Sequence, residues 1–134
     1  MKRLIFSSIF SLAVGLPMSG YVHAEDPELR FNMNVQGAGA ALSCGNRRLV
    51  KQLKSATLEY FALRPEGSDL TRIEKKFDEQ VALIRAAMGD SRSDPRSSTN
   101  CEQVLLRDAR LRLSETQKLL PPLRASSQID RSAK

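Results

Sequence analysis

The sequence predicts a mainly α protein: a small three-helix bundle of up-down-up topology with one short N-terminal β-strand, stapled by one disulfide. Three observations support this fold class. Three segments carry apolar residues at helical spacing, one short segment alternates between apolar and polar residues, and the chain has two cysteines. With 134 residues and a formal charge of +6, the chain has the length of a single domain.

Residues 1–24 have the features of a secretory signal peptide. Lys2 and Arg3 form a basic start, an apolar run follows over residues 4–14, and Val22-His23-Ala24 is a small-x-small cleavage site. The apolar run is shorter than the roughly 20 residues that a membrane-spanning helix needs. We expect cleavage near Ala24 and a periplasmic or secreted protein, with an uncleaved anchor as the alternative.

Cleavage after Ala24 would limit the chemistry of the mature chain. Loss of 24 of the 134 residues, Lys2 and Arg3 among them, leaves 110 residues with 19 basic and 15 acidic side chains, a formal charge of +4. It also removes His23, the one histidine, and with it any imidazole base or metal ligand. The sequence therefore predicts no catalytic residue, no metal site and no cofactor, and we expect that the protein is not an enzyme.

Residues 25–42 are predicted to hold a strand and a flexible Gly/Ala connector. Over residues 28–36 apolar side chains alternate with polar ones, as in a half-buried strand. The apolar ones are Leu29, Phe31, Met33 and Val35. A lone strand must pack on the helices, pair with a second copy of the chain or join a sheet in another protein. A homodimer through this strand is therefore one of the open alternatives.

Residues 43–122 are the predicted helical domain. The first helix begins near Ser43 or Asn46 and ends before Pro65, and the second begins at Ser68 or Thr71 and ends at Gly89. The third begins at Thr99 and ends at Pro121-Pro122. Residues 90–98 form a polar surface loop, and residues 123–134 are predicted to be a disordered tail.

Each predicted helix carries one apolar stripe with spacings of three and four residues. In the first helix the stripe is Leu49, Leu53, Ala56, Tyr60 and Leu63. In the second it is Leu70, Ile73, Phe77, Val81, Ile84 and Met88. In the third it is Cys101, Leu105, Ala109, Leu113, Thr116 and Leu120.

Cys44 and Cys101 are predicted to form a disulfide. Two cysteines without histidine cannot complete a zinc site, and their spacing does not fit a redox pair. Lipid attachment at Cys44 is the alternative, but charged residues separate this cysteine from the apolar run. In an up-down-up bundle the first and third helices are parallel, so both cysteines lie at the same end.

Four cations open the first predicted helix and are the candidate partner-binding residues: Arg47, Arg48, Lys51 and Lys54. Like charges four residues apart repel each other, and cations near a helix N-terminus oppose the helix macrodipole. We interpret this basic face as a binding site for an acidic partner. The alternative is a solvated face that Asp90 and Glu102 partly neutralise.

Together these features predict a small exported helical protein that binds another macromolecule and is not an enzyme. The expected partner is another envelope or secreted protein. The alternative is a cationic protein that binds an anionic envelope surface, such as lipid or polymer. Export, the modest net charge and the few aromatic residues argue against nucleic acid as a partner.

Overall fold

The computed structural model describes residues 26–65, 67–90 and 100–133, with side chains described as far as Ile129. These residues form α3 (Pro27–Ser43), α4 (Arg47–Ala62), α5 (Leu70–Met88), the short π-helix η2 (Cys101–Leu105) and α7 (Leu106–Ala133). The predicted signal peptide and most of the predicted loop lie outside them. Among the helices described, none has the length and apolarity of a membrane span.

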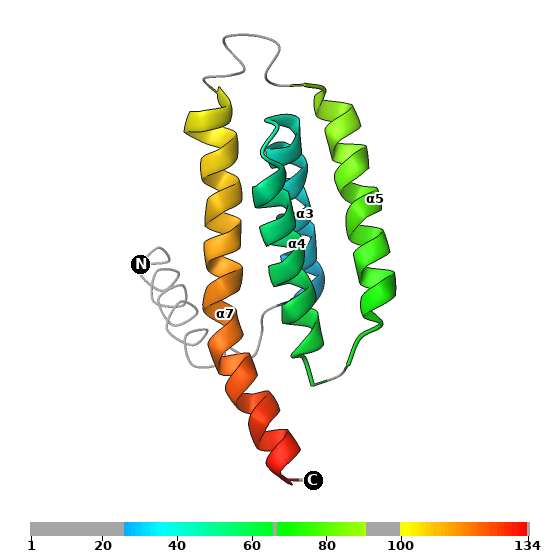
Figure 1. Cartoon of the computed structure of the whole chain (residues 1–134), viewed down its shortest axis with the longest axis vertical. Coiled ribbons are helices and arrows are strands. Elements are labelled where there is room, and N and C mark those ends of the chain that lie inside the picture. The colour runs from blue at the N-terminus through cyan, green and yellow to red at the C-terminus, as the bar shows by residue number, and fades with distance from the viewer. Residues whose placement is uncertain (1–25, 66, 91–99, 134) are drawn as a thin grey trace, which may run out of the picture.

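The helices form a bundle in which α3 and α4 lie at the centre, with α5 and α7 on opposite sides (Figure 1). α4 and α7 run in one direction, and α3 and α5 run in the other. α3 contacts α4, α5 and α7. The three predicted helices correspond to α4, α5 and η2 with α7, and α3 is a fourth helix that the sequence analysis did not predict.

The predicted strand at residues 28–36 is wrong, because these residues belong to α3. Asp26 caps the helix by accepting a hydrogen bond from the Glu28 N–H at 2.9 Å, and Pro27 lies in the first turn, where its missing N–H has little cost. Phe31, Val35 and Ala38 follow at spacings of four and three. A homodimer through this segment therefore has no strand edge to use.

The predicted Gly/Ala connector is also helical, and its glycines allow close packing. A Cβ atom built on Gly39 would lie 2.6 Å from the Cβ of Ile84 on α5 and would also contact Ile84 Cγ2. A Cβ on Gly37 would lie 3.3 Å from Cγ of Arg112, which is part of a flexible side chain on α7. Gly39 thus sets how closely α3 approaches α5.

We expect Gly39→Ala to lower the free energy of unfolding by about 1–3 kcal/mol, because overpacking against Ile84 outweighs the roughly 1 kcal/mol by which alanine favours a helix. Gly37→Ala is the matched control and should be neutral or slightly stabilising, since the Arg112 side chain can move. Urea denaturation of both variants measures the difference. In the double variant Gly39→Ala with Ile84→Ala, the loss of unfolding free energy should be smaller than the sum of the two single losses. A loss equal to that sum would contradict the packing argument.

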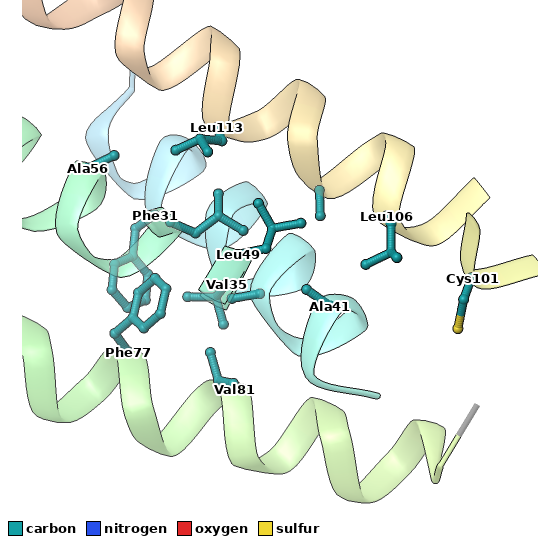
Figure 2. Packing of buried hydrophobic residues seen from close by; sticks show 13 residues of the cluster. Phe31, Val35, Ala41, Leu49, Ala56, Phe77, Val81, Cys101, Leu106 and Leu113 are labelled. Atoms are coloured by element: carbon teal, nitrogen blue, oxygen red, sulfur yellow. The ribbon is translucent and has the colours of Figure 1, made fainter. Parts of the chain in front are cut away.

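The apolar core fills the space between the four long helices (Figure 2). Phe31 and Val35 of α3 meet Phe77 and Val81 of α5, and the rings of Phe31 and Phe77 lie edge to face at 6.0 Å. α3 also contributes Ala38 and Ala41, and the members from α4, η2 and α7 include Leu49, Leu53, Cys101, Leu106 and Leu113. The stripes predicted for the three helices thus supply much of the core.

A polar cluster lies inside this core. Asn34 of α3, Thr57 of α4 and Thr116 of α7 each have an exposed fraction of 0%. The Asn34 Nδ2 donates to the hydroxyl oxygens of Thr57 and Thr116, both at 2.9 Å. Each hydroxyl also bonds the backbone carbonyl one turn earlier in its own helix, at Leu53 or Arg112. Because buried amide groups need partners, this cluster fixes the register of three helices.

Two helix boundaries differ from the prediction. α5 is capped by Asp69, which accepts from the Arg72 N–H at 3.2 Å, and not by Ser68 or Thr71. α7 does not end at Pro121-Pro122 but continues to Ala133, so residues 123–133 are helical where a disordered tail was predicted. The axis of α7 tilts in its orange part, consistent with prolines inside the helix (Figure 1).

Candidate functional site

The predicted disulfide between Cys44 and Cys101 is confirmed. The S–S distance is 2.08 Å and the Cα atoms lie 5.7 Å apart. Cys44 is the C-cap of α3, three positions before α4 begins at Arg47, and Cys101 is the first residue of η2. The bridge therefore lies at one end of the bundle, where it joins the start of α4 to the start of the η2–α7 unit.

The candidate basic face lies at this same end. Asn46 caps α4 by accepting from the Leu49 N–H at 3.1 Å, and no acidic residue occupies the first turn. Arg47, Arg48 and Lys51 are all exposed. Within the described part of the chain, the structure records no ion pair for these three residues. Their charges therefore face solvent beside the positive end of the helix dipole.

Lys54, the fourth candidate, is used inside the molecule. Its Nζ lies 3.0 Å from Asp78 Oδ1 and 3.1 Å from Glu74 Oε2, both on α5. The pKa of Lys54 is raised, chiefly by its hydrogen bond to Asp78. This cation links α4 to α5, and the structure separates it from the three exposed members of the predicted face.

A groove of about 540 Å³ runs between α4 and α7 and includes two of the exposed candidates, Arg48 and Lys51. The wall from α4 is completed by Gln52, Ser55, Ala56 and Glu59. The wall from α7 consists of Gln117, Leu120 and Arg124. Ala56 and Leu120 are buried, so the floor is apolar, whereas the side chains that rise around it are polar or charged.

An ion pair closes one end of this groove. Arg124 Nε donates to Glu59 Oε2 at 2.6 Å, and Arg124 Nη2 donates to Glu59 Oε1 at 2.9 Å. This contact lowers the pKa of the Glu59 carboxyl from its ordinary value of 4.5 and raises the pKa of Arg124. A lowered carboxyl pKa means that the pair stabilises the fold at neutral pH, and that this contribution is lost as the pH falls through the folded-state pKa.

Sequence reasoning missed Arg124, the last residue of the α7 wall, for a specific reason. It placed the end of the third helix at Pro121, so Arg124 fell in a predicted tail. The spacing of Gln117, Leu120 and Arg124, at three and four residues, was the signal that the helix continues along one face.

The arrangement suits the binding of anions. Arg48 and Lys51 are cations whose ordinary role is electrostatic attraction and hydrogen-bond donation. Within the described residues, no group of three or more His, Cys, Asp or Glu side chains is placed to hold a metal ion. Comparisons with family models, with curated proteins and with solved structures find no match for this chain.

Proposed function

We propose that this protein is an exported, non-enzymatic binding module that holds an acidic partner protein through the basic face of α4. The observation that carries the proposal is the contrast among the four predicted cations. Lys54 has two acidic partners on α5, whereas Arg47, Arg48 and Lys51 are exposed without a recorded ion pair in the described residues. An acidic residue at this helix start would stabilise the fold, whereas cations there oppose the helix dipole. Stability alone therefore does not account for the three exposed cations.

The proposed location rests on two features. Residues 1–24 have the pattern of a signal peptide. The Cys44–Cys101 bridge supports an oxidising compartment, because disulfides persist in secreted and periplasmic proteins and are rare in the cytosol. We therefore place the partner in the envelope or outside the cell. An anionic lipid or polymer surface is the competing ligand.

We expect the double variant Arg47→Glu with Lys51→Glu to lose partner capture by at least about tenfold, because reversal of both charges turns attraction into repulsion. The exported protein is immobilised and exposed to envelope extract, and captured proteins are quantified by mass spectrometry. Arg72→Glu with Lys75→Glu, at exposed positions on α5, is the charge-matched control and should capture the same proteins as wild type.

The same variant also has an expected effect on stability. A glutamate at position 47 lies in the first turn of α4 and interacts favourably with the helix dipole by roughly 0.3–1 kcal/mol, whereas position 51 is exposed and lies beyond that turn. Lost capture by a protein that is at least as stable as wild type separates binding from unfolding. Equal capture of envelope proteins by wild type and variant would contradict the proposal. Capture of anionic vesicles by wild type, with no envelope protein captured, would favour the lipid-surface alternative.

A further inference from the structure

The groove between α4 and α7 has the length of a short extended peptide. On α4 it reaches from Arg48 to Glu59, a span of about 16 Å at the helical rise of about 1.5 Å per residue. An extended chain advances about 3.3 Å per residue, so about five residues match this length. An α-helix, with a diameter of about 10–12 Å, is a poorer match for a groove of about 540 Å³.

The polar groups around the groove match a polypeptide main chain. Gln52, Ser55 and Gln117 are exposed along its walls. Amide and hydroxyl side chains both donate and accept hydrogen bonds, and a peptide main chain presents both N–H donors and C=O acceptors. The buried floor of Ala56 and Leu120 can take a small apolar side chain from the same peptide. A ligand with acceptors alone would use only half of this capacity.

The charge of the groove is uneven along its length. Arg48 and Lys51 make one end positive, whereas Glu59 and Arg124 neutralise each other at the other end. The Glu59 carboxylate at that end would repel a uniformly charged polyanion. A peptide with acidic residues toward one end fits this distribution, because its charged part lies beside Arg48 and Lys51.

The Glu59–Arg124 pair also indicates how a carboxylate binds in this groove. Both carboxylate oxygens accept from the Arg124 guanidinium, the two-point geometry that arginine uses for acidic ligands. Glu59 thereby occupies a position that a ligand carboxylate could take. Removing the Glu59 charge should open that position and extend the positive surface along the whole groove.

We infer that the groove between α4 and α7 binds an extended acidic segment of polypeptide, with its carboxylates toward Arg48 and Lys51 and with Glu59 as an internal competitor at Arg124. This inference rests on the proposed function, since it names the chemistry of the partner that the same basic face holds. It goes further in placing the ligand between two helices and not on the open surface of α4.

The test uses the exported protein and a fluorescein-labelled octapeptide with four glutamates, with the matching four-glutamine octapeptide as the control ligand. Fluorescence anisotropy gives the affinities. The glutamate peptide should bind and the glutamine peptide should bind at least about tenfold more weakly. Ser55→Trp, which fills the groove without changing its charge, should weaken glutamate-peptide binding at least about tenfold. Glu59→Gln should strengthen it about threefold or more.

The outcomes separate this inference from the proposed function. If Arg47→Glu with Lys51→Glu abolishes peptide binding while Ser55→Trp leaves it intact, the basic face binds and the groove inference is overturned. Gln117→Trp blocks the groove from its α7 wall, so misfolding of one tryptophan variant, seen by circular dichroism, leaves the test valid. Absence of glutamate-peptide binding below about 1 mM overturns the inference as well. Binding of polyphosphate or phosphatidylglycerol vesicles that Ser55→Trp does not weaken would count against it in the same way.

Discussion

Loss of the disulfide is expected to lower the free energy of unfolding by about 4 kcal/mol. Cys44 and Cys101 are 57 positions apart, so the bridge closes a long loop and removes a large amount of conformational entropy from the unfolded chain. For a domain of this size the expected total stability is about 5–15 kcal/mol. The bridge therefore accounts for a large share of it.

The measurement is urea denaturation of a variant with Cys44→Ser and Cys101→Ala. Alanine is chosen at position 101 because this side chain is buried, and a serine hydroxyl there would add a separate cost. Wild type reduced with a phosphine keeps both side chains and serves as the control, so it should show the same loss. A loss of unfolding free energy below about 1 kcal/mol in both samples would contradict the argument that the bridge stabilises the fold by restricting the unfolded chain.

The three amphipathic helices were predictable because each buries one face only. Leu49, Leu53 and Ala56 of α4, for example, lie at spacings of four and three and are all buried. Two cysteines, an up-down-up topology and the order of the helices were enough to predict the disulfide. These features depend on local periodicity and on chain connectivity, which the sequence contains directly.

The central helix was not predictable from the same signal. α3 contacts three helices, and in its second half residues 37–41 are buried on every side. A helical segment buried on every side has no polar stripe to reveal its period, which leaves only the short exposed face of the first half as a signal. The chance alternation from Leu29 to Val35 then favoured a strand, although Leu29 is 55% exposed in the helix. Asp26 and Pro27 were the local signals of a helix start.

The candidate site was predictable in part. The sequence placed four cations on the first turns of one helix, but it could not show that Lys54 meets Glu74 and Asp78, because that contact depends on how α4 and α5 are rotated about their axes. The groove depends on the small side chains of Ser55 and Ala56 facing α7. Such relationships arise from tertiary packing and not from spacing along one helix.

The buried Asn34 offers the second large effect, since its amide and an aspartate differ in charge but little in shape. We expect Asn34→Asp to lower the free energy of unfolding at pH 7 by about 3 kcal/mol or more. The side chain is fully buried, and its recorded hydrogen-bond partners are the hydroxyls of Thr57 and Thr116. A carboxylate there loses both N–H donors and has no cation among those partners.

The pH dependence of this variant identifies the cause. Burial without a cation raises the pKa of a carboxyl group, so the introduced carboxyl keeps its proton in the folded variant at a pH where the unfolded chain has released it. The unfolded state then binds fewer protons, and stability falls by about 1.4 kcal/mol per pH unit above the unfolded pKa of about 3.9, until the folded pKa is reached. Asn32→Asp, at an exposed position of the same helix, is the control and should change stability by no more than about 0.5 kcal/mol. Thermal unfolding of both variants between pH 4 and pH 8 measures how stability depends on pH. If the two variants show parallel curves of stability against pH, the carboxyl at position 34 is not buried as argued.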